Sequence, residues 1–274
     1  MIHPPIYEIY ALRYASMARN RSANLIFNDE HDGPMPMDFF VWLLKARNGA
    51  HILVDTGFNA AGAKARNRKL DCCPIQSLRV LGVDPEQIRD VILTHLHYDH
   101  AGNIDKLPAA RFHIQDAEME YATGRCMCHG VLRHAYSVED VVQLVQKVYS
   151  DRVQFHDGND QIAPGVQVLR IGGHTKGLQA VRVHTKRGWV VLASDASHYY
   201  ANMELGNPFP IVYNVADMLA GHQICREAAD SPDHVIPGHD PMVLKKYPRI
   251  EGLGVDIACL HEAPRPIASV TARD

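Results

Sequence analysis

The sequence predicts an α/β protein in which two β-sheets pack against each other and helices cover the outside. Each half of the chain shows short β-like runs followed by helical segments, which suits two packed sheets. The chain has 274 residues, of which 46% are hydrophobic and 22% are charged, so it can bury a substantial core. We expect one large domain over residues 1–274.

Composition argues against several classes of partner. The net charge of −3 gives no electrostatic reason to expect nucleic acid or an anionic membrane as partner. No apolar run approaches the roughly 20 residues that span a bilayer, and the amino terminus lacks the pattern of a signal peptide. The six cysteines include no C-x-x-C pair and predict reduced thiols. We therefore expect a cytoplasmic protein.

The first third of the chain predicts strands separated by turns. Branched and aromatic residues favour strands at 7–14, 39–44 and 51–55. The polar stretch 19–37 contains one glycine and two prolines and predicts a long loop. A helix is expected near 74–81, because proline stands at its start and Gly82 follows its end. A further strand is expected at 90–93.

The rest of the chain alternates helices and strands. Apolar spacing predicts helices at 116–122 and 138–149, the second with Ser137 as a possible cap. Between them, residues 124–136 are interpreted as a lid or pocket wall. The last elements are strands at 166–171, 179–184, 189–194 and 234–236 and a helix at 215–229. The turn 185–188 predicts a hairpin.

Residues 95–100 place four metal-capable side chains in six positions, directly after an apolar run. Imidazole nitrogens and a carboxylate suit zinc or a similar divalent transition metal. Neighbouring side chains diverge from the backbone, so four ligands this close cannot all reach one ion with good geometry. The spacing instead predicts two ions, one held by His95 and His97 and the other by Asp99 and His100.

A site with two ions needs further donors. Each zinc takes four or five donors, and a carboxylate is the best bridge between two ions. His174, Asp195 and His239 each follow a strand-like run, and His174 and His239 directly follow glycine. Strand ends project side chains toward a common rim, and glycine lets the backbone turn sharply there. We expect these three residues to complete the site.

The ordered set of seven residues resembles the metallo-β-lactamase superfamily. His95-x-His97-x-Asp99-His100, then His174, Asp195 and His239, follows the superfamily's ligand order. Val-Asp-Thr-Gly at 54–57 and Ser-Asp-Ala-Ser at 194–197 look most like its N-acyl homoserine lactonase branch. The resemblance covers about residues 38–245. It implies an αββα sandwich, with two mixed β-sheets packed face to face and helices outside.

The resemblance also implies a role for each matching position. His95, His97 and His174 would bind one divalent metal ion, and Asp99, His100 and His239 would bind a second. Asp195 would bridge the two ions, which we expect to be zinc. Asp55 is similar to the superfamily's buried aspartate that steadies the histidine loop, and such partners fix the orientation and tautomer of ligand rings.

Two segments depart from the lactonase pattern. The lactonases have a tyrosine three residues after the bridging aspartate, where its hydroxyl can contact the substrate carbonyl. This chain has His198 there, followed by Tyr199 and Tyr200. The segment around His174 reads Gly-Gly-His-Thr-Lys-Gly-Leu in place of the more usual Pro-Gly-His-Thr-Pro-Gly-His. Both departures leave the seven candidate metal ligands unchanged. They bear on which substrate the protein accepts.

The expected reaction is hydrolysis of a small-molecule lactone by attack of a metal-bridging hydroxide. Two cations lower the pKa of a shared water from about 15.7 to near neutrality and stabilise the oxyanion. No G-x-S-x-G elbow argues for a serine nucleophile. Asp99 is the candidate that passes the proton to the leaving alkoxide. His198 is expected to hydrogen-bond to the carbonyl oxygen or to substrate. The lactonase resemblance implies quorum quenching.

Other functions stay open at this point. Another ester or thioester is an alternative substrate, as in glyoxalase-II-like relatives, and so is a catabolic lactone such as a pyridoxine-derived one. Relatives with this fold also bind iron and reduce dioxygen or oxidise persulfides, but the flavin-dependent oxygen reductases carry a flavin domain for which this chain has no room. A non-catalytic binding module is a third class, which the complete ligand set argues against.

Several further residues are assigned provisional roles. Cys126 and Cys128 with His129 form a weaker alternative metal clip, because their spacing is unusual for zinc. Solvent-facing loop positions are favoured for His129 and His134 over a place in the pocket wall, and likewise for Arg19 and Arg21 over binding of an acidic substrate group. The remaining histidines that we consider, His113, His156, His184 and His222, are interpreted as ordinary packed or surface residues. The amino-terminal arm and the loop 19–37 are candidates for shaping either a pocket or a homodimer contact.

Overall fold

The larger of two sheets contains eight strands in the order β12-β13-β1-β2-β3-β4-β5-β6. The computed structural model describes residues 4–27 and 32–265. From β12 to β3 the strands pair antiparallel, and from β3 to β6 they pair parallel, so the sheet is mixed. Its strands are β1 (Tyr7–Met17), β2 (Met37–Ala46), β3 (His51–Val54), β4 (Asp90–Ile92), β5 (Arg111–Gln115), β6 (Val153–His156), β12 (Arg249–Ile250) and β13 (Asp256–Cys259).

The smaller sheet has the order β11-β10-β9-β8-β7. Strands β10 and β11 pair parallel, and the other neighbours pair antiparallel. The predicted hairpin is confirmed, because Thr185 at the end of β9 faces Gly188 at the start of β10. The strands are β7 (Asp160–Ala163), β8 (Val166–Arg170), β9 (Gln179–Thr185), β10 (Gly188–Ser194) and β11 (Val235–Pro237).

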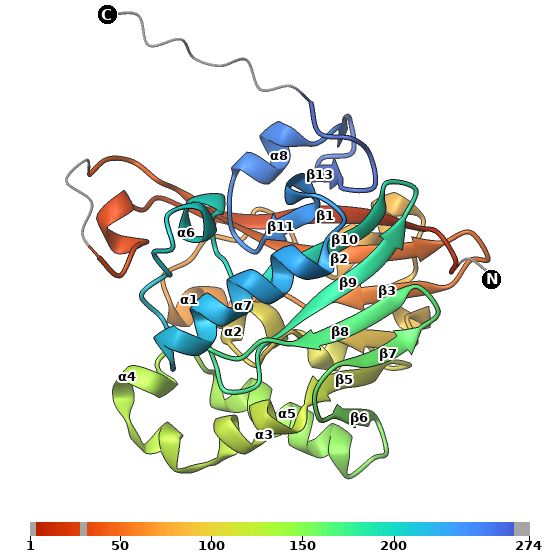
Figure 1. Cartoon of the computed structure of the whole chain (residues 1–274). Helices are drawn as coiled ribbons and strands as arrows, with labels where there is room; N and C mark the ends of the chain where they lie inside the picture. The colour runs from red at the N-terminus through yellow and green to blue at the C-terminus, as the bar shows by residue number, and fades with distance from the viewer. Residues whose placement is uncertain (1–3, 28–31, 266–274) are drawn as a thin grey trace, which may run out of the picture.

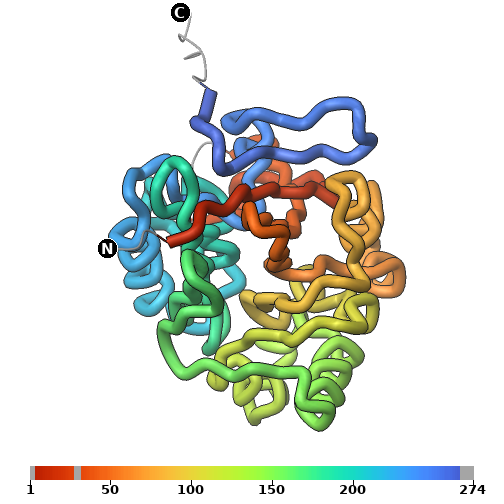
Figure 2. The backbone as a smooth tube through the Cα atoms, turned by 90° about the vertical axis from the view of Figure 1, so that its right-hand side faces the viewer, coloured from red at the N-terminus to blue at the C-terminus, as the bar shows by residue number. Residues whose placement is uncertain are grey.

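Helices cover the outer faces of both sheets. In Figure 1, α7 crosses in front of the smaller sheet, and Figure 2 shows α7 (light blue) on the opposite side from the orange segment that contains α1. None of the helices in the described chain is long and apolar enough to cross a membrane. They are α1 (Ala60–Ala65), α2 (Tyr98–Ala101), α3 (Asp116–Thr123), α4 (Gly130–Arg133), α5 (Val138–Val148), α6 (Tyr200–Glu204), α7 (Val215–Ala228) and α8 (Met242–Lys246). Short 3-10 helices are η1 (Arg21–Ala23), η2 (Gln76–Leu81), η3 (Pro85–Gln87), η4 (Ile104–Lys106), η5 (Arg125–Cys128) and η6 (Pro232–His234).

Alternation along the central strands explains the four layers. In β2, Trp42 packs into the core between the two sheets, whereas its neighbours Val41 and Leu43 pack against the helices outside. In β10, Leu192 likewise faces the other sheet, and Val191 faces the side covered by α7. Successive side chains of a strand point to opposite faces, so a strand that is apolar on both faces must lie between two layers. The predicted αββα sandwich is therefore confirmed.

Five strands were not predicted, namely β5, β6, β7, β12 and β13. Two of them contain buried polar residues that interrupt the apolar pattern of a strand. These are His113 in β5 and His156 in β6, which hydrogen-bond to each other at 3.1 Å. The segment predicted as a helix at 74–81 is the 3-10 helix η2, ended by Gly82 with φ +73°. Ser137 stands at the N-cap position of α5, as predicted, but its hydroxyl donates to Glu139 and accepts from no backbone N–H.

Candidate metal centre

Strand ends from both sheets bring the predicted residues together. Thr94 and His95 follow β4 of the larger sheet, and Asp195 and His239 follow β10 and β11 of the smaller one. Because β10 and β11 run parallel, their carboxyl ends lie at the same edge. His174 lies in the turn between β8 and β9, where it follows two glycines with positive φ. Segments far apart in sequence therefore meet at one end of the sandwich.

The first group of candidate ligands contains His95, His97, His174 and Asp195. All four residues are buried, and one donor atom from each lies within 4.8 Å of the others. The His174 Nε2 atom is 3.0 Å from His97 Nδ1 and 3.0 Å from Asp195 Oδ2. Donors that bind one zinc at about 2.0–2.1 Å lie roughly 3.3 Å apart in a tetrahedron, so the four atoms are spaced for a single ion.

The second group contains Asp99, His100 and His239, which are also buried. The Asp99 Oδ2 atom is 3.9 Å from the Nε2 atoms of both histidines. This spacing is slightly wider than in the first group, and it is still within the reach of one cation. The residues predicted from the sequence lie in two adjacent groups, and a third group, Asp195, His198 and His239, shares one residue with each of them.

The carboxylate of Asp195 lies between the two groups. Its Oδ2 atom faces His174 at 3.0 Å and His95 at 3.7 Å. Its Oδ1 atom faces His239 at 3.0 Å and His100 at 3.4 Å. One oxygen is therefore directed to each group, which is the arrangement that a bridging carboxylate needs.

Unpartnered buried atoms converge on the same place. Within the described residues, His95 Nε2, His100 Nε2 and Asp195 Oδ1 are buried without a hydrogen-bond partner. Buried polar atoms in folded proteins nearly always have a partner, so a cluster of unpartnered acceptors needs an explanation. A pair of divalent cations supplies one, and the donor set of imidazole and carboxylate fits zinc.

Outer hydrogen bonds orient three of the histidines. The Nδ1 atom of His100 lies 2.8 Å from Asp55 Oδ2, that of His174 lies 2.6 Å from the Ile211 carbonyl, and that of His239 lies 2.8 Å from the Asp38 carbonyl. An Nδ1–H that donates to these oxygens leaves the lone pair on Nε2, directed at the centre.

Asp55 also contacts Thr94, as expected for a buried aspartate that steadies the histidine loop. It is fully buried with φ +60°, and its carboxylate accepts from the backbone N–H of Thr94 at 2.7 Å and from the Thr94 hydroxyl at 2.8 Å. Asp55 therefore connects the start of the 95–100 segment to the His100 ring.

Burial and neighbouring charges favour the ligand forms of several groups. Burial, and after it the other histidines of the cluster, lowers the pKa of His95 and His97 well below the usual value, so both rings are neutral. Burial alone would raise the pKa of Asp195, but four surrounding histidines, led by His198, hold it well below its usual range. A neutral imidazole and a charged carboxylate are the forms that bind a metal ion.

Glu118 is a site residue that the sequence analysis missed. It lies on α3 and is fully buried, and four donors point at its carboxylate. Oε1 accepts from the Leu96 N–H and the Tyr136 hydroxyl, both at 2.9 Å. Oε2 accepts from the Thr175 hydroxyl at 2.6 Å and the Gly177 N–H at 3.1 Å. Glu118 therefore connects the loop of His95 and His97 to the loop of His174. Its only sequence signal is an acidic residue in the first turn of a helix.

His198 faces Asp195 in the structure. Its Nε2 atom lies 3.1 Å from Asp195 Oδ2, and its ring stacks on Phe209 with a centroid distance of 3.7 Å. Burial lowers the pKa of His198 to about 3, so the ring is neutral. From this position Nε2 can donate to the carboxylate or bind a cation, and Asp195, His198 and His239 form a metal-capable group of their own. The Nδ1 atom of His198 is buried and has no partner among the described residues.

A cavity of about 150 Å³ opens beside the centre. His97, Asp99, His174, Asp195, His239 and His198 all contribute to its lining. Arg19 lines it too, so the solvated-loop interpretation of Arg19 is wrong, whereas Arg21 does not line it. His134 is exposed at the edge of this cavity, and His129 does not line it. The segment 124–136 thus contributes to the wall through His134 and Ala135.

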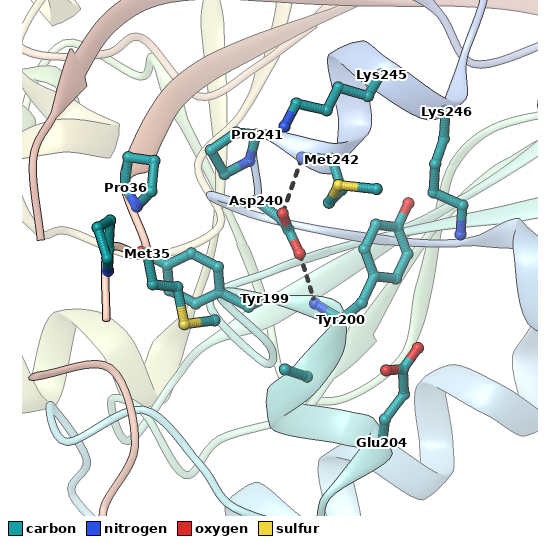
Figure 3. Close-up of a pocket in the computed structure, with 12 residues that line it drawn as sticks. Met35, Pro36, Tyr199, Tyr200, Glu204, Asp240, Pro241, Met242, Lys245 and Lys246 are labelled. Atoms are coloured by element: carbon teal, nitrogen blue, oxygen red, sulfur yellow. Dashed lines mark hydrogen bonds between the residues drawn. The ribbon is translucent and has the colours of Figure 1, made fainter. Parts of the chain in front are cut away.

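A larger cavity of about 460 Å³ has a lining that includes none of the metal-capable cluster (Figure 3). Its lining includes Asp240, whose carboxylate accepts from the Tyr200 N–H at 3.0 Å and the Met242 N–H at 2.8 Å (Figure 3). These bonds hold the segment that follows His198 against the segment that follows His239. We therefore assign Asp240 a positioning role and place the chemistry in the smaller cavity.

The structure does not support the alternative metal site predicted at Cys126, Cys128 and His129. Across residues 4–27 and 32–265, the groups of three or more metal-capable side chains contain none of Cys126, Cys128 and His129. All six cysteines are free thiols.

The fold and the site define a class of protein. The family model described as the Metallo-beta-lactamase superfamily matches residues 40–239. The chain therefore belongs to the metallo-β-lactamase superfamily, as its ligand order predicted.

The relatives within the superfamily are more specific. An N-acyl homoserine lactonase from Bacillus sp is 30% identical over 190 residues, which are 63% of this chain and 70% of the relative. An N-acyl homoserine lactonase from Bacillus cereus is 34% identical over 134 residues, which are 48% of this chain and 48% of the relative. A solved N-acyl homoserine lactone hydrolase, with the product N-hexanoyl-L-homoserine bound at its catalytic metal centre, matches with a TM-score of 0.71 and 22% identity, over 89% of this chain and 96% of the other. That last likeness establishes the fold.

Proposed function

We propose that this protein is a hydrolase that uses two divalent metal ions to open the ring of a small lactone. One observation carries the proposal: the two carboxylate oxygens of Asp195 are divided between two buried groups of histidine and aspartate. Zinc is the proposed metal, because it is bound by histidine nitrogen and carboxylate oxygen and has no redox chemistry of its own.

Each group would hold one ion. The proposed ligands are His95, His97 and His174 for the first ion and Asp99, His100 and His239 for the second, with Asp195 shared. When bound, such a pair supplies a water of near-neutral pKa and positive charge to stabilise an oxyanion.

Side chains of the protein would transfer the proton from the attacking water to the leaving ring oxygen. In the net reaction water adds to the acyl carbon, the ring C–O bond breaks, and the proton released by the water ends on the ring oxygen to give a hydroxy acid. Asp99 is the proposed carrier of this proton, because its carboxylate lines the cavity and its side chain keeps 12% exposure, whereas that of Asp195 keeps 3%. His198 is proposed to assist by hydrogen-bonding to the carbonyl oxygen or to another part of the substrate.

Relatives support a lactone as the substrate. Both curated relatives described above are N-acyl homoserine lactonases, and the solved hydrolase holds the product N-hexanoyl-L-homoserine at its metal centre. A role in quorum quenching would follow if the substrate is of that class. The alternative substrates are a pyridoxine-derived lactone, another ester, or a thioester, since His198 stands where the lactonases have a tyrosine.

Metal analysis together with a hydrolysis panel tests the proposal. The zinc-loaded protein should contain two ions per chain and should add one water to members of a lactone panel, detected by mass. Parallel thioester, ester and β-lactam panels distinguish the alternatives. A protein with two bound ions that opens no lactone but cleaves a thioester would replace the proposal. A coloured, iron-containing protein without hydrolytic activity would reject it.

A further inference from the structure

We infer that the substrate carries a carboxylate on its non-reacting part, which Arg19 and Arg68 bind at the mouth of the cavity. This inference rests on the proposed function and narrows it to compact, anionic lactones. Arg19, Arg66 and Arg68 all line the same small cavity as the proposed metal ligands. Arginine recognises carboxylates through two parallel N–H donors, so a pair of guanidiniums beside a reaction centre favours an anionic ligand.

Among the described residues, these three cations have no carboxylate within ion-pair distance, although the charge of Arg66 acts on Asp140 at longer range. Over residues 4–27 and 32–265, no carboxylate forms an ion pair with Arg19, Arg66 or Arg68. Other arginines of the chain do have carboxylate partners, namely Arg13, Arg79, Arg170, Arg187 and Arg249. The chain as a whole has a net charge of −3, so positive charge concentrates at this mouth against the general trend. Such a concentration steers anions toward the cavity.

Neutral groups hold two of the guanidiniums in place. Arg19 donates from Nε to Asn24 Oδ1 at 2.6 Å and from Nη2 to the Ala23 carbonyl at 2.5 Å. Arg66 donates to the carbonyls of His134 at 2.6 Å and Tyr136 at 2.8 Å. These contacts restrict the side chains without neutralising them. A ligand therefore meets charges that are already positioned. The arginine side chains then lose less conformational entropy when the ligand binds.

Arg68 has an unused donor. Its Nε is buried, and no described residue accepts a hydrogen bond from it. The side chain lies next to the Tyr98 hydroxyl and close enough to Arg19 for the two charges to repel. Burial, which is the largest cause, and this repulsion both lower the pKa of Arg19. A carboxylate between Arg19 and Arg68 would satisfy the free donor and remove the repulsion.

The volume of the cavity limits the substrate further. Cavities that enclose drug-sized ligands measure about 300–1,000 Å³. This one measures about 150 Å³, so the part of the substrate that lies against the metal-capable residues is small. Its lining also includes Phe209, which packs beneath Arg19 with 5.1 Å from the guanidinium carbon to the ring centroid. The geometry suits a small ring with a short acidic substituent.

A pair of probes that differ only in charge tests this inference. The first is γ-butyrolactone bearing a carboxylate at the γ carbon, and the second is its neutral primary carboxamide. With zinc-loaded protein at low salt, the carboxylate should be opened with a kcat/KM roughly tenfold or more above that of the carboxamide, mainly through KM. Raised salt should reduce this ratio, because the arginines are partly exposed.

Substitution then locates the effect. The Arg19→Gln/Arg68→Gln variant should bring the ratio close to one while keeping both zinc ions. Arg79→Gln is the control, because it removes the same kind of charge at a residue outside the cavity. Equal kcat/KM for the two probes in the wild type, or an unchanged ratio in the double variant, would overturn the inference while leaving the hydrolase proposal intact.

Binding of the ring-opened products provides a readout that does not depend on turnover. Calorimetry should show 2-hydroxyglutarate, the product of the first probe, binding roughly tenfold or more tightly than the monoanionic product of the carboxamide. The double variant should lose this difference, and Arg79→Gln should keep it. If no member of the lactone panel is opened but the binding difference follows the arginines, the lactonase proposal fails and the anion site stands. Equal binding in the wild type would reject the anion site.

Discussion

Glu118 accepts a hydrogen bond of 2.6 Å from the hydroxyl of Thr175, the residue directly after His174. The other oxygen of the same carboxylate accepts from the backbone N–H of Leu96, which lies between His95 and His97. A single buried side chain therefore sets the spacing between the two loops that form the first group of candidate ligands. Outer contacts of this kind strongly affect the affinity of metal sites.

Replacing Glu118 with glutamine should weaken metal binding. The amide keeps the size but places an NH₂ group against donors, so at least one of the four hydrogen bonds is lost. We expect a decrease of about 10–100-fold in zinc affinity, measured by competition with a chelator. The free energy of unfolding should fall by about 1–3 kcal/mol. Glu120→Gln is the control, because Glu120 lies on the same helix with its carboxylate exposed and paired with Lys176. Equal affinities in both variants would remove Glu118 from this role.

Replacing Asp195 with asparagine should release metal while the fold is retained. The amide has only one oxygen, so it cannot direct a charged oxygen to both groups. We expect fewer than two ions per chain by elemental analysis and loss of most turnover, with an unchanged circular dichroism spectrum. Asp157→Asn is the control, since the side chain of Asp157 is 81% exposed. Two ions and normal activity in Asp195→Asn would contradict the bridging assignment.

Replacing His198 with alanine should reduce turnover and leave both metal ions in place. The ring contacts Asp195 and Phe209, and in our assignment it is not a ligand. We expect lower kcat/KM with unchanged zinc content, and His184→Ala, at a residue that does not line the cavity, should leave both unchanged. Loss of an ion on His198→Ala would instead make His198 a ligand.

Adding a methyl group at Gly177 should destabilise the site loop. A Cβ at this position would lie 2.1 Å from the backbone nitrogen of Glu118, which cannot move without shifting α3. We expect Gly177→Ala to lower the free energy of unfolding in urea by about 1–3 kcal/mol, as for other overpacked positions. Gly130→Ala should have little effect, because nothing lies within 4 Å of the added Cβ. Equal free energies of unfolding for the two variants would show that α3 can shift at little cost.

Much of the fold could be predicted because its central strands have clear patterns. β2 and β10 are continuous runs of branched and aromatic residues, and both were recognised within a few residues of their bounds. β5, β6 and β7 were missed, because polar residues interrupt their apolar pattern. His113 illustrates the reason: it is buried in a strand, and contacts with His156 and Asp90 satisfy its ring. No local pattern reveals such a partner.

The sequence by itself determined the order of the seven candidate ligands, since four lie in one short segment and three follow apolar runs that end as strands. Only the tertiary structure decided what surrounds them. Glu118 is 22 positions from Leu96 and 57 from Thr175, and Arg19 and Arg68 come from separate loops. Contacts between such distant segments depend on how the sheets and helices pack, and packing is a property of the whole chain.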